Sequence, residues 1–67
     1  MKLDYVEVWY SERWVGWYWT AWLTGDRAHT EWHSEGEYTR RADAERGAER
    51  YVAREWPDFE LGPWADA

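Results

Sequence analysis

The sequence predicts an α+β fold in which a three-stranded antiparallel meander sheet packs on one C-terminal α-helix (β-β-β-α). Two early segments are rich in valine and aromatic residues, a third alternates strictly in polarity, and a fourth has alanines at helical spacing before Pro57. The 67 residues include no cysteine, which excludes disulfides and cysteine-ligated zinc. We expect one β-β-β-α domain over residues 1–56 and an acidic C-terminal tail over 57–67.

Three segments are predicted as strands: Leu3–Tyr10, Trp14–Thr24 and Arg27–Glu35. The first two carry the β-branched and aromatic residues that favour a pleated sheet. The third alternates with the period of a half-buried strand and ends at Gly36. Gly25 and Asp26 stand where a two-residue hairpin loop would join the second and third strands.

The helix is predicted to begin after Thr39 as its N-cap and to run to about Trp56, since Pro57 ends it. Its inner arc carries small and apolar side chains suited to a sheet of large indoles: Ala44, Ala48, Tyr51, Val52 and Trp56. The opposite arc is expected to face solvent: Arg46, Glu49, Arg50 and Arg54. In the tail, the apolar residues are expected to fold back onto the body: Phe59, Leu61 and Trp64.

A Gly25-Asp26 loop would pair Trp19 with Trp32 and Tyr18 with His33, and directly opposed residues share a face. The face against the helix would then hold the following residues: Val15, Trp17, Trp19, Ala21, Leu23, Ala28, Thr30, Trp32 and Ser34. For the first turn we expect an even loop length, which adds Val6 and Val8 to this face. An odd loop would instead bury Glu7, which is costly without a partner.

The other face of the sheet is predicted to gather aromatic and charged residues: Tyr5, Glu7, Trp9, Trp14, Tyr18, Trp22, His29, Glu31 and His33. A single helix covers only one side of a sheet, so this aromatic face is left open. Contiguous exposed aromatic residues usually mark an interaction surface. Two alternatives are that the tail folds over this face or that a homodimer buries it.

The pattern His29-x-Glu31-x-His33-x-Glu35 is the nearest approach to a metal site, since alternate strand residues point the same way. It is equally typical of a solvent-facing strand, and its histidines would also respond to pH. Ser34 and His33 are neighbours on a strand and so face opposite sides, and the chain is too short for a deep catalytic pocket. We therefore expect no enzyme activity, no metal and no cofactor.

The charge is strongly acidic, with 14 acidic and 8 basic residues and a net charge of −6. Residues 1–38 carry three basic and seven acidic residues (net −4), 39–56 five and four (net +1), and 57–67 none and three (net −3). Direct nucleic-acid binding is therefore unexpected, since it needs clustered Lys and Arg, whereas a basic protein partner is favoured. The predicted partner-binding residues are Glu7, Trp9, Trp14, Tyr18, Trp22, Glu31, Glu35 and Glu37.

No apolar run reaches the length of about 18 residues that a membrane span requires. The N-terminal residues also lack the long apolar segment of a signal peptide. We therefore expect a cytoplasmic protein that does not enter a membrane.

The segment His33–Glu45, HSEGEYTRRADAE, follows a tryptophan-rich hairpin and resembles the third strand and helix start of YegP-like small β-β-β-α domains of bacteria and archaea. That resemblance covers residues 5–54 and implies the fold but little about function. In its character as a tiny, acidic, aromatic-rich domain, the chain is also similar to phage-encoded inhibitors of host defence, such as anti-CRISPR proteins and DNA mimics. This second resemblance implies a non-enzymatic inhibitor that occludes a nucleic-acid-binding surface of a host complex. The alternatives are a homodimeric structural module and, less favoured, a sheet-type DNA-binding domain.

Overall fold

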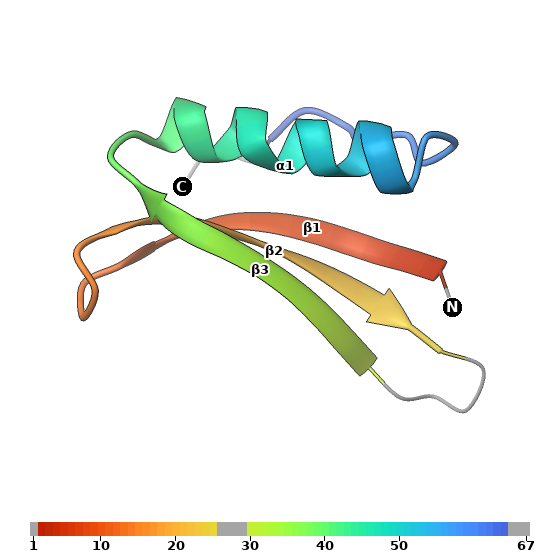
Figure 1. Ribbon diagram of the computed structural model, residues 1–67, viewed down its shortest axis with the longest axis horizontal. Helices are drawn as coiled ribbons and strands as arrows, with labels where there is room; N and C mark the ends of the chain where they lie inside the picture. The colour runs from red at the N-terminus through yellow and green to blue at the C-terminus, as the bar shows by residue number, and fades with distance from the viewer. Residues whose placement is uncertain (1, 26–29, 65–67) are drawn as a thin grey trace.

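The computed structural model describes residues 2–25 and 30–64. Four elements follow one another along the chain: β1 (Lys2–Ser11), β2 (Gly16–Thr24), β3 (Thr30–Tyr38) and α1 (Arg41–Glu55). The strands form one antiparallel sheet in the order β1-β2-β3, and α1 lies across one face of it (Figure 1). The predicted β-β-β-α fold is therefore confirmed.

The first hairpin has the predicted even loop, since four residues separate the paired Ser11 and Gly16. Val6 lies opposite Ala21 and Val8 opposite Trp19, so both valines are on the helix side of the sheet. The backbone N–H of Trp14 donates to the Ser11 hydroxyl at 3.1 Å, which holds the turn together.

A β-bulge at Asp4 adjusts the start of β1. Leu3 pairs with Leu23 and Tyr5 with Trp22, so one extra residue stands on β1 between the two pairs. In a regular strand Leu3 and Tyr5 would lie on the same face, because side chains alternate from one residue to the next. The bulge lets Leu3 enter the core while Tyr5 stays on the opposite face.

The second hairpin differs from the prediction. Thr24 pairs with Thr30 rather than with Arg27, so five residues separate the paired ends instead of two. The register is thus shifted by three residues, and an odd shift turns every side chain of a strand to the other face. Trp32 consequently lies opposite Trp22, and His33 lies opposite Ala21.

The expected positions of Trp32 and Ser34 against the helix are therefore wrong, as is the outward position of His33. Val15, also expected against the helix, lies exposed in the first turn. The observed register brings the His33 ring parallel to Tyr51 of α1, with ring centroids 4.8 Å apart and an interplanar angle of 5°. It also sets the Ser34 hydroxyl beside that of Thr20. Ala28 and His29, also part of the register prediction, lie outside the described residues, as does the side chain of Thr30.

A second bulge lies near the end of β3, where Tyr18 pairs with Gly36 but Trp17 pairs with Tyr38. The extra residue, Glu37, has a φ of 72°. This bulge returns Tyr38 to the helix side, where its hydroxyl lies so close to Gly47 that a Cβ there would come within 2.3 Å of it. Gly47, in the middle of α1, therefore permits the helix to approach the side chain of Tyr38 at the end of β3.

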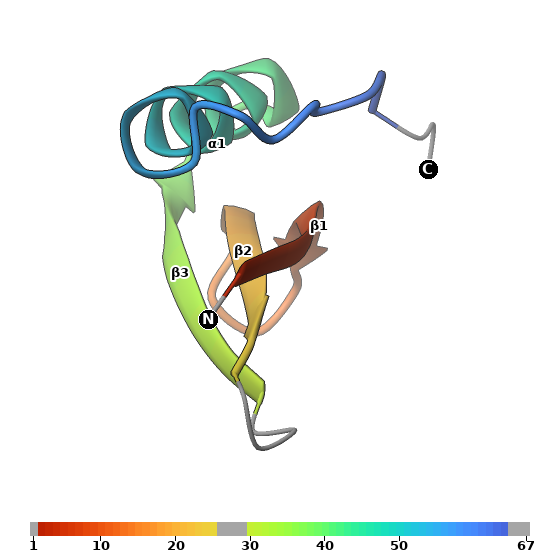
Figure 2. The same cartoon turned by 90° about the vertical axis from the view of Figure 1, so that its right-hand side faces the viewer.

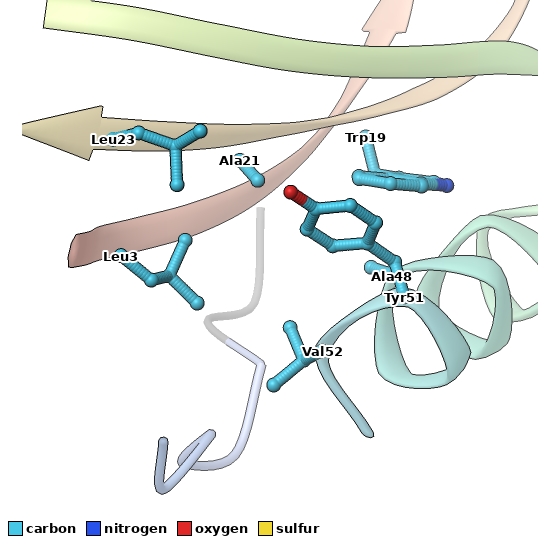
Figure 3. Packing of buried hydrophobic residues seen from close by; sticks show 7 residues of the cluster. All are labelled: Leu3, Trp19, Ala21, Leu23, Ala48, Tyr51 and Val52. Carbon is cyan, nitrogen blue, oxygen red and sulfur yellow. The ribbon is translucent and has the colours of Figure 1, made fainter. Parts of the chain in front are cut away.

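The core lies between the sheet and α1 (Figure 3). Trp19 is fully buried, and its ring centroid is 5.0 Å from that of Tyr51. The predicted inner arc of the helix is confirmed, since four of its members are buried: Ala44, Ala48, Tyr51 and Val52. Short side chains at Ala44 and Ala48 leave room for the indole of Trp19.

The helix begins later than predicted, because its N-cap residue is Arg40 rather than Thr39. Arg40 makes no side-chain capping hydrogen bond, and its Nε instead donates to Asp43 Oδ2 at 3.1 Å. Asp43 lies in the first turn of α1, where its carboxylate complements the helix dipole.

The tail turns back along the face of the sheet that α1 covers (Figure 2). Phe59, Leu61 and Trp64 pack against the core as expected, and Trp64 Nε1 donates to Glu49 Oε2 at 3.3 Å. Residues 57–64 therefore belong to the packed body. In residues 2–25 and 30–64, no helix is both long and apolar enough to cross a membrane.

Candidate functional site

The sheet face opposite α1 and the tail, which we call the outer face, is open to solvent. It contains a shallow groove of about 370 Å³, which we call the outer groove. All three strands and the first turn contribute its lining: Glu7, Trp9, Trp14, Tyr18, Thr20, Trp22, Trp32 and Ser34. In Figure 2, α1 and residues 57–64 lie on the other side of the sheet. No described segment therefore covers this groove.

Trp22 and Trp32 form one wall of the groove, and Tyr5 continues this row of aromatic residues onto β1 beyond the lining. Tyr5 pairs with Trp22, and Trp22 pairs with Trp32. The rings of Tyr5 and Trp22 are stacked, with centroids 6.1 Å apart and an interplanar angle of 23°. Trp32 is 63% exposed, so much of its indole surface is available to a ligand.

The other wall is formed by Trp9 and Tyr18, whose rings are stacked with centroids 5.0 Å apart and an interplanar angle of 21°. The next residue in this row is Gly36, and the Tyr18 ring lies directly on its backbone. A Cβ at Gly36 would come within 1.7 Å of Tyr18 Cδ2, so only glycine permits this approach. Trp14, in the turn, extends the wall and is 63% exposed.

A polar row lies between the two walls, with Glu7 on β1, Thr20 on β2 and Ser34 on β3. Trp9 Nε1 donates to Thr20 Oγ1 at 3.0 Å, and Thr20 Oγ1 donates to Ser34 Oγ at 3.2 Å. Ser34 Oγ in turn donates to the carbonyl oxygen of Trp19 at 3.1 Å. This chain of hydrogen bonds joins the groove floor to the backbone of the central strand and holds the Trp9 indole in place.

The carboxylate of Glu7 is held in a similar way, since Trp22 Nε1 donates to Glu7 Oε1 at 3.0 Å. Among the described residues that line the groove, Glu7 alone carries a carboxylate, and none carries a basic group. At the turn end, the guanidinium carbon of Arg13 lies 5.2 Å from the ring centroid of Trp14. The groove therefore combines open aromatic faces with one oriented negative charge.

Five of the eight predicted binding residues line this groove: Glu7, Trp9, Trp14, Tyr18 and Trp22. Two others do not. Glu35 lies opposite Trp19 on the helix side, where its Oε2 is 4.0 Å from His33 Nε2, and Glu37 is the exposed extra residue of the second bulge. The side chain of Glu31 lies outside the described residues.

Three residues that line the groove are not among the predicted binding residues: Thr20, Trp32 and Ser34. Thr20 alternates with Tyr18 and Trp22, so strand periodicity alone could have placed it between them. Trp32 and Ser34 depended on the length of the second loop, and the wrong register turned them inward.

In the alternation of histidine and glutamate, for which no metal was expected, His29 and the side chain of Glu31 lie outside the described residues. Of the remaining two residues, His33 stacks on Tyr51 of α1 and stays exposed at the helix side of the sheet. In the described part of the chain, no three His, Asp or Glu residues gather as potential metal ligands.

A second groove, of about 440 Å³, runs between α1 and the tail. Its walls are apolar residues that also pack against the core, among them Val52, Trp56 and Phe59. It is therefore the seam where the tail meets the helix, whereas no segment within residues 2–25 and 30–64 packs over the outer groove.

The chain as a whole was also compared with known proteins. No protein-family model matches it, and no curated protein or solved structure is significantly similar to it.

Proposed function

We propose that this chain is a non-enzymatic binding protein that docks its outer face on a basic surface of another protein. The observation that carries the proposal is the open outer groove, where aromatic residues from all three strands and the first turn surround Glu7. Large exposed aromatic patches are rare on small proteins that act alone, and tryptophan and tyrosine dominate binding hot spots.

The charge distribution supports a basic partner. The net charge is −6, and residues 1–38, which include all three strands, contribute −4 of it. Such a field attracts a basic surface before contact and raises the rate of association at low ionic strength. Arg46, Arg50 and Arg54 lie on the exposed side of α1, away from the groove, so a docked partner would not meet them.

Basic surfaces commonly serve to bind nucleic acid, because phosphate binding depends on Lys and Arg. An acidic protein that occupies such a surface prevents nucleic acid from reaching it. We therefore extend the proposal to a cytoplasmic inhibitor of a nucleic-acid-binding complex, in the manner of the anti-CRISPR and DNA-mimic proteins that the chain is similar to in character.

The proposal is tested by capturing proteins from cells of the source organism with three baits. The first is the wild-type chain, and the second carries Trp32→Ala and Glu7→Gln in the groove. The third carries Tyr10→Ala and Glu55→Gln, a matched loss of one exposed aromatic ring and one carboxylate outside it.

A nucleic-acid-binding protein retained by the wild-type and control baits but lost from the groove variant is the expected result. Equal recovery by all three baits would show that the outer groove is not the binding surface.

The same variants address self-association. We expect the wild-type chain to sediment as a monomer at micromolar concentration. A wild-type dimer that Trp32→Ala dissociates, and Tyr10→Ala does not, would assign the outer face to a homodimer and contradict the proposal.

A further inference from the structure

We propose that the outer groove binds an arginine side chain of the partner, with the guanidinium held against its aromatic walls near Glu7. This inference rests on the proposed function, because it specifies the chemistry of the same surface. It goes further in that it names the one group on a basic partner that the groove recognises.

The dimensions of the groove suit a slender side chain rather than a folded segment. The two aromatic rows are separated by four residues along each strand, which corresponds to a backbone distance of about 13 Å at ~3.3 Å per residue. The rings themselves take up part of that width. The small side chains of Thr20 and Ser34 form the floor between them, leaving space for a flat group above.

At Trp9 and Trp22 the ligand meets ring faces rather than indole N–H groups. The Nε1 donors of Trp9 and Trp22 are already engaged by Thr20 and Glu7. The faces of aromatic rings carry the negative part of their quadrupole, so they attract cations and repel anions. A phosphate or carboxylate ligand would meet both these faces and the charge of Glu7.

Glu7 supplies the ionic contact. Trp22 holds Oε1, which orients the carboxylate, and no described residue donates a hydrogen bond to Oε2. No Lys or Arg among the described lining residues neutralises the charge. A cation that enters the groove can therefore bond to a carboxylate that is already in position.

Two features favour arginine over lysine. A guanidinium is planar, stacks on aromatic faces and presents a fork of donors, whereas an ammonium is a compact and strongly hydrated charge. The chain itself also places a guanidinium on this surface, since Arg13 lies over the ring of Trp14 at the turn end of the groove. The exposed ring of Trp32 offers an arginine from outside a contact of the same kind.

The test is a nuclear magnetic resonance titration of the intact chain with N-acetyl-arginine amide. The readout is the indole N–H signals of Trp9 and Trp22, with those of Trp56 and Trp64 as internal controls, because the latter two bond to Tyr51 and Glu49 away from the groove. The matched probes are the amides of N-acetyl-citrulline, which keeps the shape but lacks the charge, and of N-acetyl-lysine.

We expect arginine amide to shift the Trp9 and Trp22 signals and to bind about tenfold more tightly than citrulline amide, the size of effect typical of a charge-assisted hydrogen bond with a cation–π contact. Lysine amide should be intermediate. Glu7→Gln should weaken arginine binding several-fold, whereas Glu12→Gln, in the exposed turn, should leave it unchanged.

Equal binding of arginine and citrulline, equal binding of lysine and arginine, or no shift at Trp9 and Trp22 with any probe would each overturn the arginine inference. None of these results overturns the proposed function, which depends on whether the groove variant with Trp32→Ala and Glu7→Gln loses the captured partner. Conversely, undiminished capture by that variant would contradict the proposed function even if free arginine amide enters the groove.

Discussion

The hydrogen-bond chain under the outer groove yields a quantitative prediction for Thr20→Val. Valine has nearly the shape of threonine and a similar preference for strands, so the change removes the hydroxyl with little effect on packing. Thr20 is 5% exposed and takes part in two hydrogen bonds, one from Trp9 Nε1 at 3.0 Å and one to Ser34 Oγ at 3.2 Å. Both are lost in the variant.

The size of the effect follows from these two bonds. Each contributes about 1 kcal/mol net, and the added methyl group offsets up to ~0.8 kcal/mol of the loss, so we expect the free energy of unfolding to fall by about 1–2 kcal/mol. For a domain of this size that corresponds to a decrease in Tm of roughly 5–15 °C. Ser34 keeps its bond to the carbonyl oxygen of Trp19, which limits the damage.

Urea unfolding followed by tryptophan fluorescence measures this change, with Thr20→Ser as the control that keeps the hydroxyl. The Trp9 indole N–H signal should move in Thr20→Val and stay in place in Thr20→Ser. A Thr20→Val variant as stable as the wild type, with the Trp9 signal unmoved, would show that the hydrogen bonds from Trp9 to Thr20 and from Thr20 to Ser34 do not stabilise the groove.

Three further changes have expected outcomes. Gly36→Ala should displace the Tyr18 ring, since the new Cβ would lie 1.7 Å from it. The lost ring stacking and the added strain should lower the free energy of unfolding by about 1–2 kcal/mol. Thermal unfolding and the Tyr18 ring signals measure these effects, and an unmoved ring contradicts them. Gly47→Ala should destabilise by about 1–3 kcal/mol despite the better helix propensity of alanine, because the Tyr38 hydroxyl would be 2.3 Å from the new Cβ; a more stable variant in urea unfolding would show that Tyr38 moves freely. Leu23→Ala should lower the free energy of unfolding by about 2–5 kcal/mol because it leaves a cavity in the core; a loss below ~1 kcal/mol in the same assay would mean that Leu23 is not packed as described.

The elements themselves could be predicted because their signals are local. Valine and aromatic content identified β1 and β2, and the alanine spacing that ends before Pro57 identified α1. The first register could also be predicted, because one of its two possibilities would have buried Glu7. The free-energy cost of burying a carboxylate without a partner is large enough to exclude that register.

The second register could not be obtained in this way. On β3 both faces carry polar and aromatic residues, so neither Trp32 nor His33 is excluded from the core by its chemistry. The deciding contacts are the stacking of His33 on Tyr51 and the bond between Thr20 and Ser34, which depend on the position of α1 and the loop length. An odd register shift turns every side chain of β3 to the other face, so the wrong register left Trp32 out of the predicted site.

The two bulges lay beyond prediction for a related reason. Each inserts one residue so that a particular side chain, Leu3 or Tyr38, reaches the helix side. Whether that gain exceeds the cost of an irregular strand depends on the space left by α1. Most of the candidate site was nevertheless predicted from the sequence. The side chains of the central strand β2 alternate regularly, and the pairing of β1 with β2 then places the β1 residues on the same two faces.

The arrangement of the outer groove as rows that each draw one residue from β1, β2 and β3 has a mechanical consequence. A ligand lying along these rows spans the sheet at right angles to the strands and touches all three at once. It would therefore act as a cross-brace that resists separation of the edge strand β3 from its neighbour. Occupancy of the groove should accordingly appear as slower hydrogen exchange at the backbone amides of β3.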